Sequence, residues 1–121
     1  MPHIIVEYSA NLPDEHWDID QLLNALVDAA VATTLFPTSG MRARAVRCDH
    51  YHVGNGNSDN GFLNVTMRVG AGRDPGVRQK AGEQIFATLR DELSTLTNAR
   101  PVALSFEMAE LDSVKFNHKT T

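Results

Sequence analysis

Four short stretches of the chain combine β-branched residues with alternation of apolar and polar positions. They predict strands over residues 3–8, 41–48, 62–69 and 102–108, each turning one side toward a core. Residues 54–61, between the second and third strands, are all Gly, Asn, Asp or Ser and suit tight turns. These two strands are therefore expected to form a hairpin-like pair with a long loop.

Two longer stretches repeat apolar residues at the spacing of an α-helix. The first is expected from Ile19 to about Thr34, with Asp18 as its N-cap. The second begins at Asp74-Pro75, an N-cap followed by proline at the first helical position. Its predicted buried stripe is Val77, Ala81, Ile85, Leu89, Leu93 and Leu96. The polar residues after Leu111 are expected to be peripheral.

The resulting β-α-β-β-α-β order predicts a single α+β domain over residues 1–121, a two-layer α/β sandwich with both helices on one face of the sheet. The face toward the helices would carry Ile4, Val6, Tyr8, Leu63, Val65, Met67, Val69, Val102, Leu104, Phe106 and Met108. The other face would carry His3, Ile5, Glu7, Asn64, Thr66, Arg68, Ser105 and Glu107. This mixed face suits a polar subunit interface and a solvated surface equally well.

Composition narrows the class of protein. The 121 residues are 42% hydrophobic and 21% charged, which is a globular mixture, and 11 basic against 15 acidic residues give a net charge of −4. That balance argues against nucleic acid as a partner. Cys48 is the single cysteine and cannot form an internal disulfide. The apolar runs are too short to span a membrane, and residues 1–5 do not resemble a secretory signal, so we expect a cytoplasmic protein.

Two local motifs resemble other kinds of site, namely a metal site and a nucleotide-binding loop. Cys48, His50 and His52 alternate and could point the same way, as metal ligands do, but no suitably spaced fourth ligand follows and we favour ordinary surface, with no metal. The run from Gly70 to Arg73 lacks the lysine and the third glycine of nucleotide-binding loops. It predicts a turn with an anion-binding tip instead.

Four strings lie in order along the chain. They are Pro2-His3-Ile4-Ile5-Val6-Glu7, Phe36-Pro37 followed by Gly40-Met41-Arg42-Ala43-Arg44, Gly70-Ala71-Gly72-Arg73, and Ala103-Leu104-Ser105-Phe106-Glu107. Together they resemble the 5-carboxymethyl-2-hydroxymuconate isomerase family of the tautomerase superfamily over essentially the whole chain, residues 49–61 excepted. The resemblance implies a repeated β-α-β fold, a homotrimer, no cofactor, an amino-terminal proline as catalytic base or acid, and a role in homoprotocatechuate degradation, a branch of aromatic catabolism.

Pro2 would become a secondary amine at the chain terminus once Met1 is removed. The reference pKa of an α-amino group is about 7.7 to 8.0, and both burial and nearby guanidinium charges lower it. Such an amine suits proton transfer near neutral pH. A retained Met1 would leave Pro2 with an amide nitrogen, which has no basicity.

Arginines complement carboxylates, because a planar guanidinium holds a carboxylate through two hydrogen bonds and stays charged. Arg42 and Arg44 should project from one face of a strand, and Arg73 directly precedes a helix. The resemblance favours Arg42 and Arg73 as substrate-binding residues, with Arg44 as a second choice. The sequence thus predicts an isomerase of an unsaturated 2-hydroxy di- or tricarboxylate such as 5-carboxymethyl-2-hydroxymuconate. The alternatives are another tautomerase-type reaction on a related acid and a non-catalytic trimeric binding protein.

Overall fold

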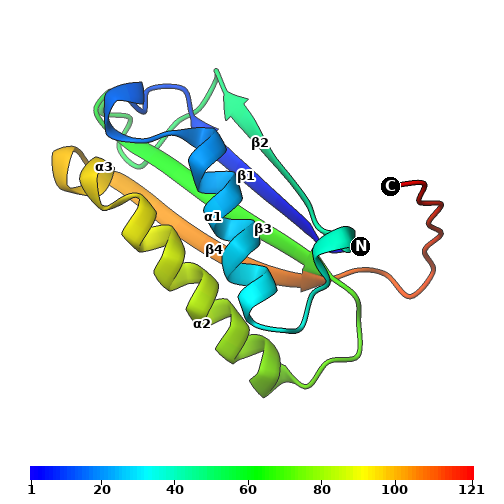
Figure 1. The fold of residues 1–121 in the computed structure, drawn as a ribbon. Helices are drawn as coiled ribbons and strands as arrows, with labels where there is room; N and C mark the ends of the chain where they lie inside the picture. Colours follow the sequence, from blue (N-terminus) through cyan, green and yellow to red (C-terminus); the bar gives the residue numbers. More distant parts are fainter.

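The computed structural model describes residues 1–121 and confirms the two-layer α+β architecture. Its elements are β1 (His3–Ser9), α1 (Ile19–Ala32), β2 (Arg42–Cys48), β3 (Gly61–Val69), α2 (Pro75–Glu92), α3 (Ser94–Ala99) and β4 (Val102–Glu110). The helices lie together on one face of the four-stranded sheet (Figure 1). None of the helices is both long enough and apolar enough to cross a membrane.

The strand order corrects one prediction. The sheet runs β2-β1-β3-β4, with β1 parallel to β2, antiparallel to β3, and β3 parallel to β4. The expected hairpin of residues 41–48 with 62–69 is wrong, because β1 lies between these two strands. Each half of the chain is instead a β-α-β unit, in which the helix carries the chain back across the sheet so that the next strand is parallel.

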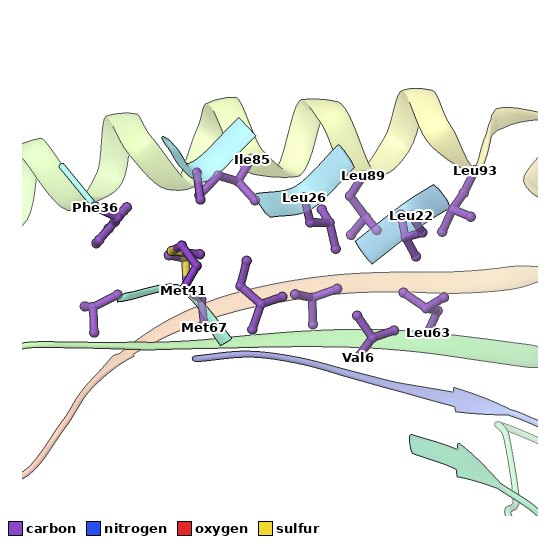
Figure 2. Close-up of a cluster of buried hydrophobic side chains, with 14 of the residues drawn as sticks. Val6, Leu22, Leu26, Phe36, Met41, Leu63, Met67, Ile85, Leu89 and Leu93 are labelled. Atoms are coloured by element: carbon purple, nitrogen blue, oxygen red, sulfur yellow. The ribbon is translucent and has the colours of Figure 1, made fainter. Parts of the chain in front are cut away.

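The core forms where the predicted apolar faces meet. Ile4, Val6, Leu63 and Met67 of the two central strands are fully buried. Above them lies the shared stripe of the helices, which includes Leu22 and Leu26 of α1 and Ile85 and Leu89 of α2 (Figure 2). The predicted residues of β4 are only half-buried, because β4 is an edge strand. Alternation along the strands thus located the covered face correctly.

The second helix departs from its prediction at both ends. Val77, predicted to be buried, is 43% exposed in the first turn of α2, and the buried stripe begins at Ala81. At Leu93 the backbone leaves helical geometry (φ −104°, ψ 13°), and the stripe continues into α3. Leu93 and Leu96 are nevertheless buried as predicted. Side-chain spacing cannot reveal such a break, because the apolar period persists across it.

The opposite face of the sheet has no helix over it (Figure 1). One row across it runs from Arg44 on β2 through Ile5 and Thr66 to Glu107 on β4. Because β2 and β4 are the two free edges, this row ends in a cation at one edge and a carboxylate at the other. The mixed character predicted for this open face is confirmed.

Candidate active site at the amino terminus

Four chain segments meet at one end of the sheet. β1 and β2 begin there and β3 and β4 end there, because His3 pairs with both Arg42 and Arg68, and Arg68 pairs with Ala109. The amino terminus lies at this end (Figure 1). Residues distant in sequence therefore surround Pro2.

Pro2 is buried and is held by its backbone. Its carbonyl oxygen accepts a hydrogen bond from the Arg42 amide at 3.0 Å, which extends the pairing of β1 with β2 past the strand ends. Gly40 is also buried, and a Cβ atom placed on it would stand 3.4 Å from Cδ of Pro2 and 3.6 Å from Cγ of Pro37. A larger residue at position 40 would occupy the space beside the proline ring.

The Arg42 side chain lies next to this terminus. Its Nη1 donates to the carbonyl oxygens of Ser39 (3.2 Å) and Met41 (3.0 Å), and its Nη2 donates to Oγ1 of Thr121 (2.9 Å). The guanidinium is therefore held in a defined position, while its charge has no carboxylate partner within 4.0 Å. Both properties suit a residue that holds an anionic ligand.

The side chain of Arg73 makes more contacts than is usual for an arginine in a loop. It donates to the carbonyl oxygens of Gly70 (3.2 Å) and Leu35 (3.0 Å), and its guanidinium carbon lies 4.9 Å from the ring centre of Phe36. These contacts tie the loop after β3 to the loop after α1. A guanidinium still has N–H donors left over for a ligand after serving two carbonyls.

In the glycine turn, where an anion-binding tip was predicted, the backbone N–H groups already donate to carboxylates of this chain. The Gly72 amide donates to Oε2 of Glu110 at 2.8 Å, and the N-cap Asp74 accepts from the Gly76 amide at 2.7 Å. The backbone donors of this turn thus serve the protein's own carboxylates. The anion at the Gly72 amide is thus a carboxylate of this chain, and the side chain of Arg73 is the group of this turn that is left for a ligand.

Arg44, unlike Arg42 and Arg73, is not among the charges that lower the pKa of the terminal amine. It is exposed on the open face, where its Nη1 is 3.1 Å from Nδ1 of His3. The suggested metal ligands do not converge either: Nε2 of His52 bonds the Gly54 carbonyl at 3.0 Å, and no three His, Cys, Asp or Glu side chains gather as a metal site requires. The structure groups Pro2 with Arg42 and Arg73, and we call these three residues the terminal site.

The local charge favours unprotonated groups. Burial and then Lys115, Lys119, Arg42 and Arg73 lower the pKa of the terminal amine, which here belongs to Met1, below its usual 8.0. Burial and then Arg44 lead the causes that lower the pKa of His3 below 6.5, so its ring is free to accept from Arg44. A neutral amine among cations can accept a proton, which is the property a catalytic base needs.

Sequence reasoning missed three neighbours of the terminal site. Lys115 and Lys119 belong to the segment expected to be peripheral, yet both lie close enough to lower the pKa of the terminal amine. No periodicity marks them, because their segment is neither helix nor strand. Gly40 lay within a recognised string but had no assigned role, and its proximity to Pro2 could emerge only from the fold.

Solved structures with only 12–16% identity share this architecture, among them a fused 4-OT symmetric trimer with a TM-score of 0.67, covering 97% of this chain and 93% of that one. The fold is thus shared with proteins of very different sequence. Closer relatives give the family. A curated 5-carboxymethyl-2-hydroxymuconate Delta-isomerase from Escherichia coli is 37% identical over 92% of this chain and 87% of its own length.

Two crystal structures agree with that relative. A 5-carboxymethyl-2-hydroxymuconate delta-isomerase superposes with a TM-score of 0.92 at 31% identity, covering 100% of this chain and 89% of the other. A 5-carboxymethyl-2-hydroxymuconate isomerase from Deinococcus radiodurans R1 gives a TM-score of 0.88 at 31% identity, covering 99% and 90%. The model of the 5-carboxymethyl-2-hydroxymuconate isomerase family matches residues 2–121. The chain belongs to this family of isomerases.

Proposed function

We propose that this protein isomerises 5-carboxymethyl-2-hydroxymuconate without a cofactor, using the amine of Pro2 to carry the proton. The amine removes the proton of the 2-hydroxyl group, the double bonds shift along the chain, and the same proton is returned to a distant carbon. One O–H bond is broken and one C–H bond is formed, so no oxidant or reductant is needed. The observation that carries the proposal is that Pro2 is buried next to the chain terminus, where Arg42 and Arg73, from separate segments, both lower the pKa of the adjoining Met1 amine.

Proline at position 2 provides a base of suitable strength. Removal of Met1 would expose a secondary amine whose reference pKa is already about 7.7 to 8.0, whereas a lysine starts at about 10.4. Pro2 is buried, and burial disfavours a protonated amine. Burial would therefore increase the fraction of the amine that is neutral, and ready to accept a proton, near neutral pH.

Arg42 and Arg73 are proposed to bind the substrate and to stabilise the charge that develops on it. As the hydroxyl proton leaves, negative charge spreads from the oxygen over the conjugated chain. Guanidinium groups fixed by backbone carbonyls need little reorganisation to stabilise that charge. Arg44 is kept out of this role, because its guanidinium is engaged with His3 on the open face.

The protein is further proposed to be a homotrimer. Ile5 and Phe62 are only partly covered, and the open face ends in Arg44 at one free edge and Glu107 at the other. Opposite charges on two different edges suit head-to-tail contact between copies, which closes into a ring. Light scattering should give three times 13.3 kDa, and Ile5→Glu should shift it toward a folded monomer. A wild-type monomer at micromolar concentration would overturn this assembly.

The function is tested with two forms of the protein that differ only at the terminus. One has Met1 removed, as verified by intact mass, and the other carries an extension that keeps Pro2 in a peptide bond. The first should isomerise 5-carboxymethyl-2-hydroxymuconate, and the second should lose at least about 100-fold in rate, because general-base catalysis is typically worth that much or more. Absence of turnover by the first form would overturn the proposed substrate. Full activity of the extended form would overturn the role of Pro2.

A further inference from the structure

The last ten residues of the chain, 112–121, form an exposed tail that returns to the terminal site. The tail leaves the end of β4 and turns back toward the amino terminus (Figure 1). Its start is fixed by the Leu111 amide, which donates to the Val69 carbonyl at 2.7 Å. Its far end is fixed by Thr121, whose Oγ1 accepts from Arg42. The tail is thus attached at both ends, and its two lysines lie close enough to the chain terminus to lower the pKa of the Met1 amine.

Each lysine of this tail lies beside one arginine of the terminal site. Nζ of Lys119 lies 3.4 Å from the Ser39 carbonyl oxygen, which also accepts from Nη1 of Arg42 at 3.2 Å. Two cationic groups therefore converge on one oxygen atom. No carboxylate lies within 4.0 Å of either charge.

Lys115 and Arg73 form a second pair of cations, near Gly70. A Cβ atom built on Gly70 would stand 3.6 Å from Nζ of Lys115 and 3.9 Å from Nη1 of Arg73. The acids nearest along the chain bind elsewhere: Asp74 accepts from the Gly76 amide, Asp112 accepts from the Val114 amide, and Glu110 is engaged with the Gly72 amide and Arg78. This pair of cations also has no carboxylate partner within 4.0 Å.

Paired like charges with no counter-charge repel each other, and a bound anion relieves that repulsion. We propose that Lys115 and Lys119 are substrate-binding residues, which add two cations to those of Arg42 and Arg73 and make the site selective for a tricarboxylate over a dicarboxylate. The inference rests on the proposed function. The substrate named there carries the two carboxylates of muconate and a further one on its carboxymethyl group, so it has more anionic ends than two arginines can hold through bidentate contacts.

The assignment is tested with the variants Lys115→Met and Lys119→Met, which keep most of the aliphatic stem and remove the charge. Lys80→Met, on the exposed surface of α2, is the matched control, because it loses the same charge outside the site. Steady-state kinetics would compare 5-carboxymethyl-2-hydroxymuconate with 2-hydroxymuconate, which lacks the carboxymethyl group. A charge-assisted contact is worth about 10-fold or more in binding.

Each tail variant should raise KM for the tricarboxylate about 10-fold or more, with a smaller change for the dicarboxylate and none in Lys80→Met. Binding of unreactive propane-1,2,3-tricarboxylate, measured by calorimetry, should weaken in the same variants. Weakened binding without turnover by wild-type protein would support the lysines while contradicting the proposed function. Wild-type turnover with unchanged KM and unchanged calorimetric affinity in both tail variants would overturn the role of the tail.

Discussion

The two faces of the sheet are built from the same strands, but the side chains of one face are apolar and buried, whereas those of the other are mixed and partly charged. On the covered face, Ile4, Val6, Leu63 and Val65 are fully buried against the helices. At the end of the open face, the charged side chain of Arg42 is held in place by hydrogen bonds to carbonyl oxygens, without a carboxylate beside it. One face gains stability from burial, whereas the other keeps charge available for a ligand or a second copy.

Truncation of the covered face should have the largest effect on stability. Leu26 is fully buried between α1 and the sheet, and Leu26→Ala should lower the free energy of unfolding by about 2–5 kcal/mol. Val77→Ala, in the exposed first turn of α2, is the control and should change it by no more than about 0.5 kcal/mol. Chemical denaturation gives both values, and equal losses would contradict the placement of the core.

Loss of an arginine of the terminal site should act mainly on substrate binding. Arg42→Ala and Arg73→Ala should each cost about 1.5–3 kcal/mol of binding, or about 10- to 150-fold in KM for the carboxylate substrate. Arg44→Ala, on the open face, should leave KM nearly unchanged. Equal effects of all three substitutions would contradict the grouping of Pro2 with Arg42 and Arg73 alone.

Arg73→Ala should also destabilise the fold by roughly 0.5–1.5 kcal/mol for each hydrogen bond lost, since its guanidinium joins Leu35 to Gly70. A loop arginine with a free side chain would show no such loss. Thermal unfolding of the variant separates this structural contribution from the change in KM. An unchanged midpoint would show that these two contacts contribute nothing to stability.

His3 should give the smallest effect, seen only in the pH dependence of stability. Its pKa is lower in the folded protein than the 6.5 of an unfolded chain, mainly through burial and then Arg44. Below about pH 6.5 the unfolded state therefore binds more protons, so stability falls as the pH is lowered through this range and is fully present above it. His3→Gln should flatten this part of the profile in denaturation measured at several pH values. An unchanged slope would contradict the lowered pKa.

The two faces also differ in how far the sequence could predict them. Alternation in residues 62–69 and the helical spacing of Leu22 and Leu26 placed the core, because burial imposes the period of the backbone on the side chains. The strand order could not be predicted from the sequence, because the position of β1 between β2 and β3 depends on pairing between segments far apart in the chain. The position of Lys115 and Lys119 near the terminal site could not be predicted for the same reason, since only the path of the tail brings them there.

The central claim is that the amine of Pro2, surrounded by cations, is the group that carries the proton. A direct test is an NMR titration of protein that lacks Met1 and carries ¹⁵N-proline at position 2, compared with the pH profile of kcat/KM. We expect an amine pKa below about 7.7 to 8.0 that coincides with the acidic limb of the profile. An amine pKa at or above 8, or an acidic limb at a different pH, would contradict the account.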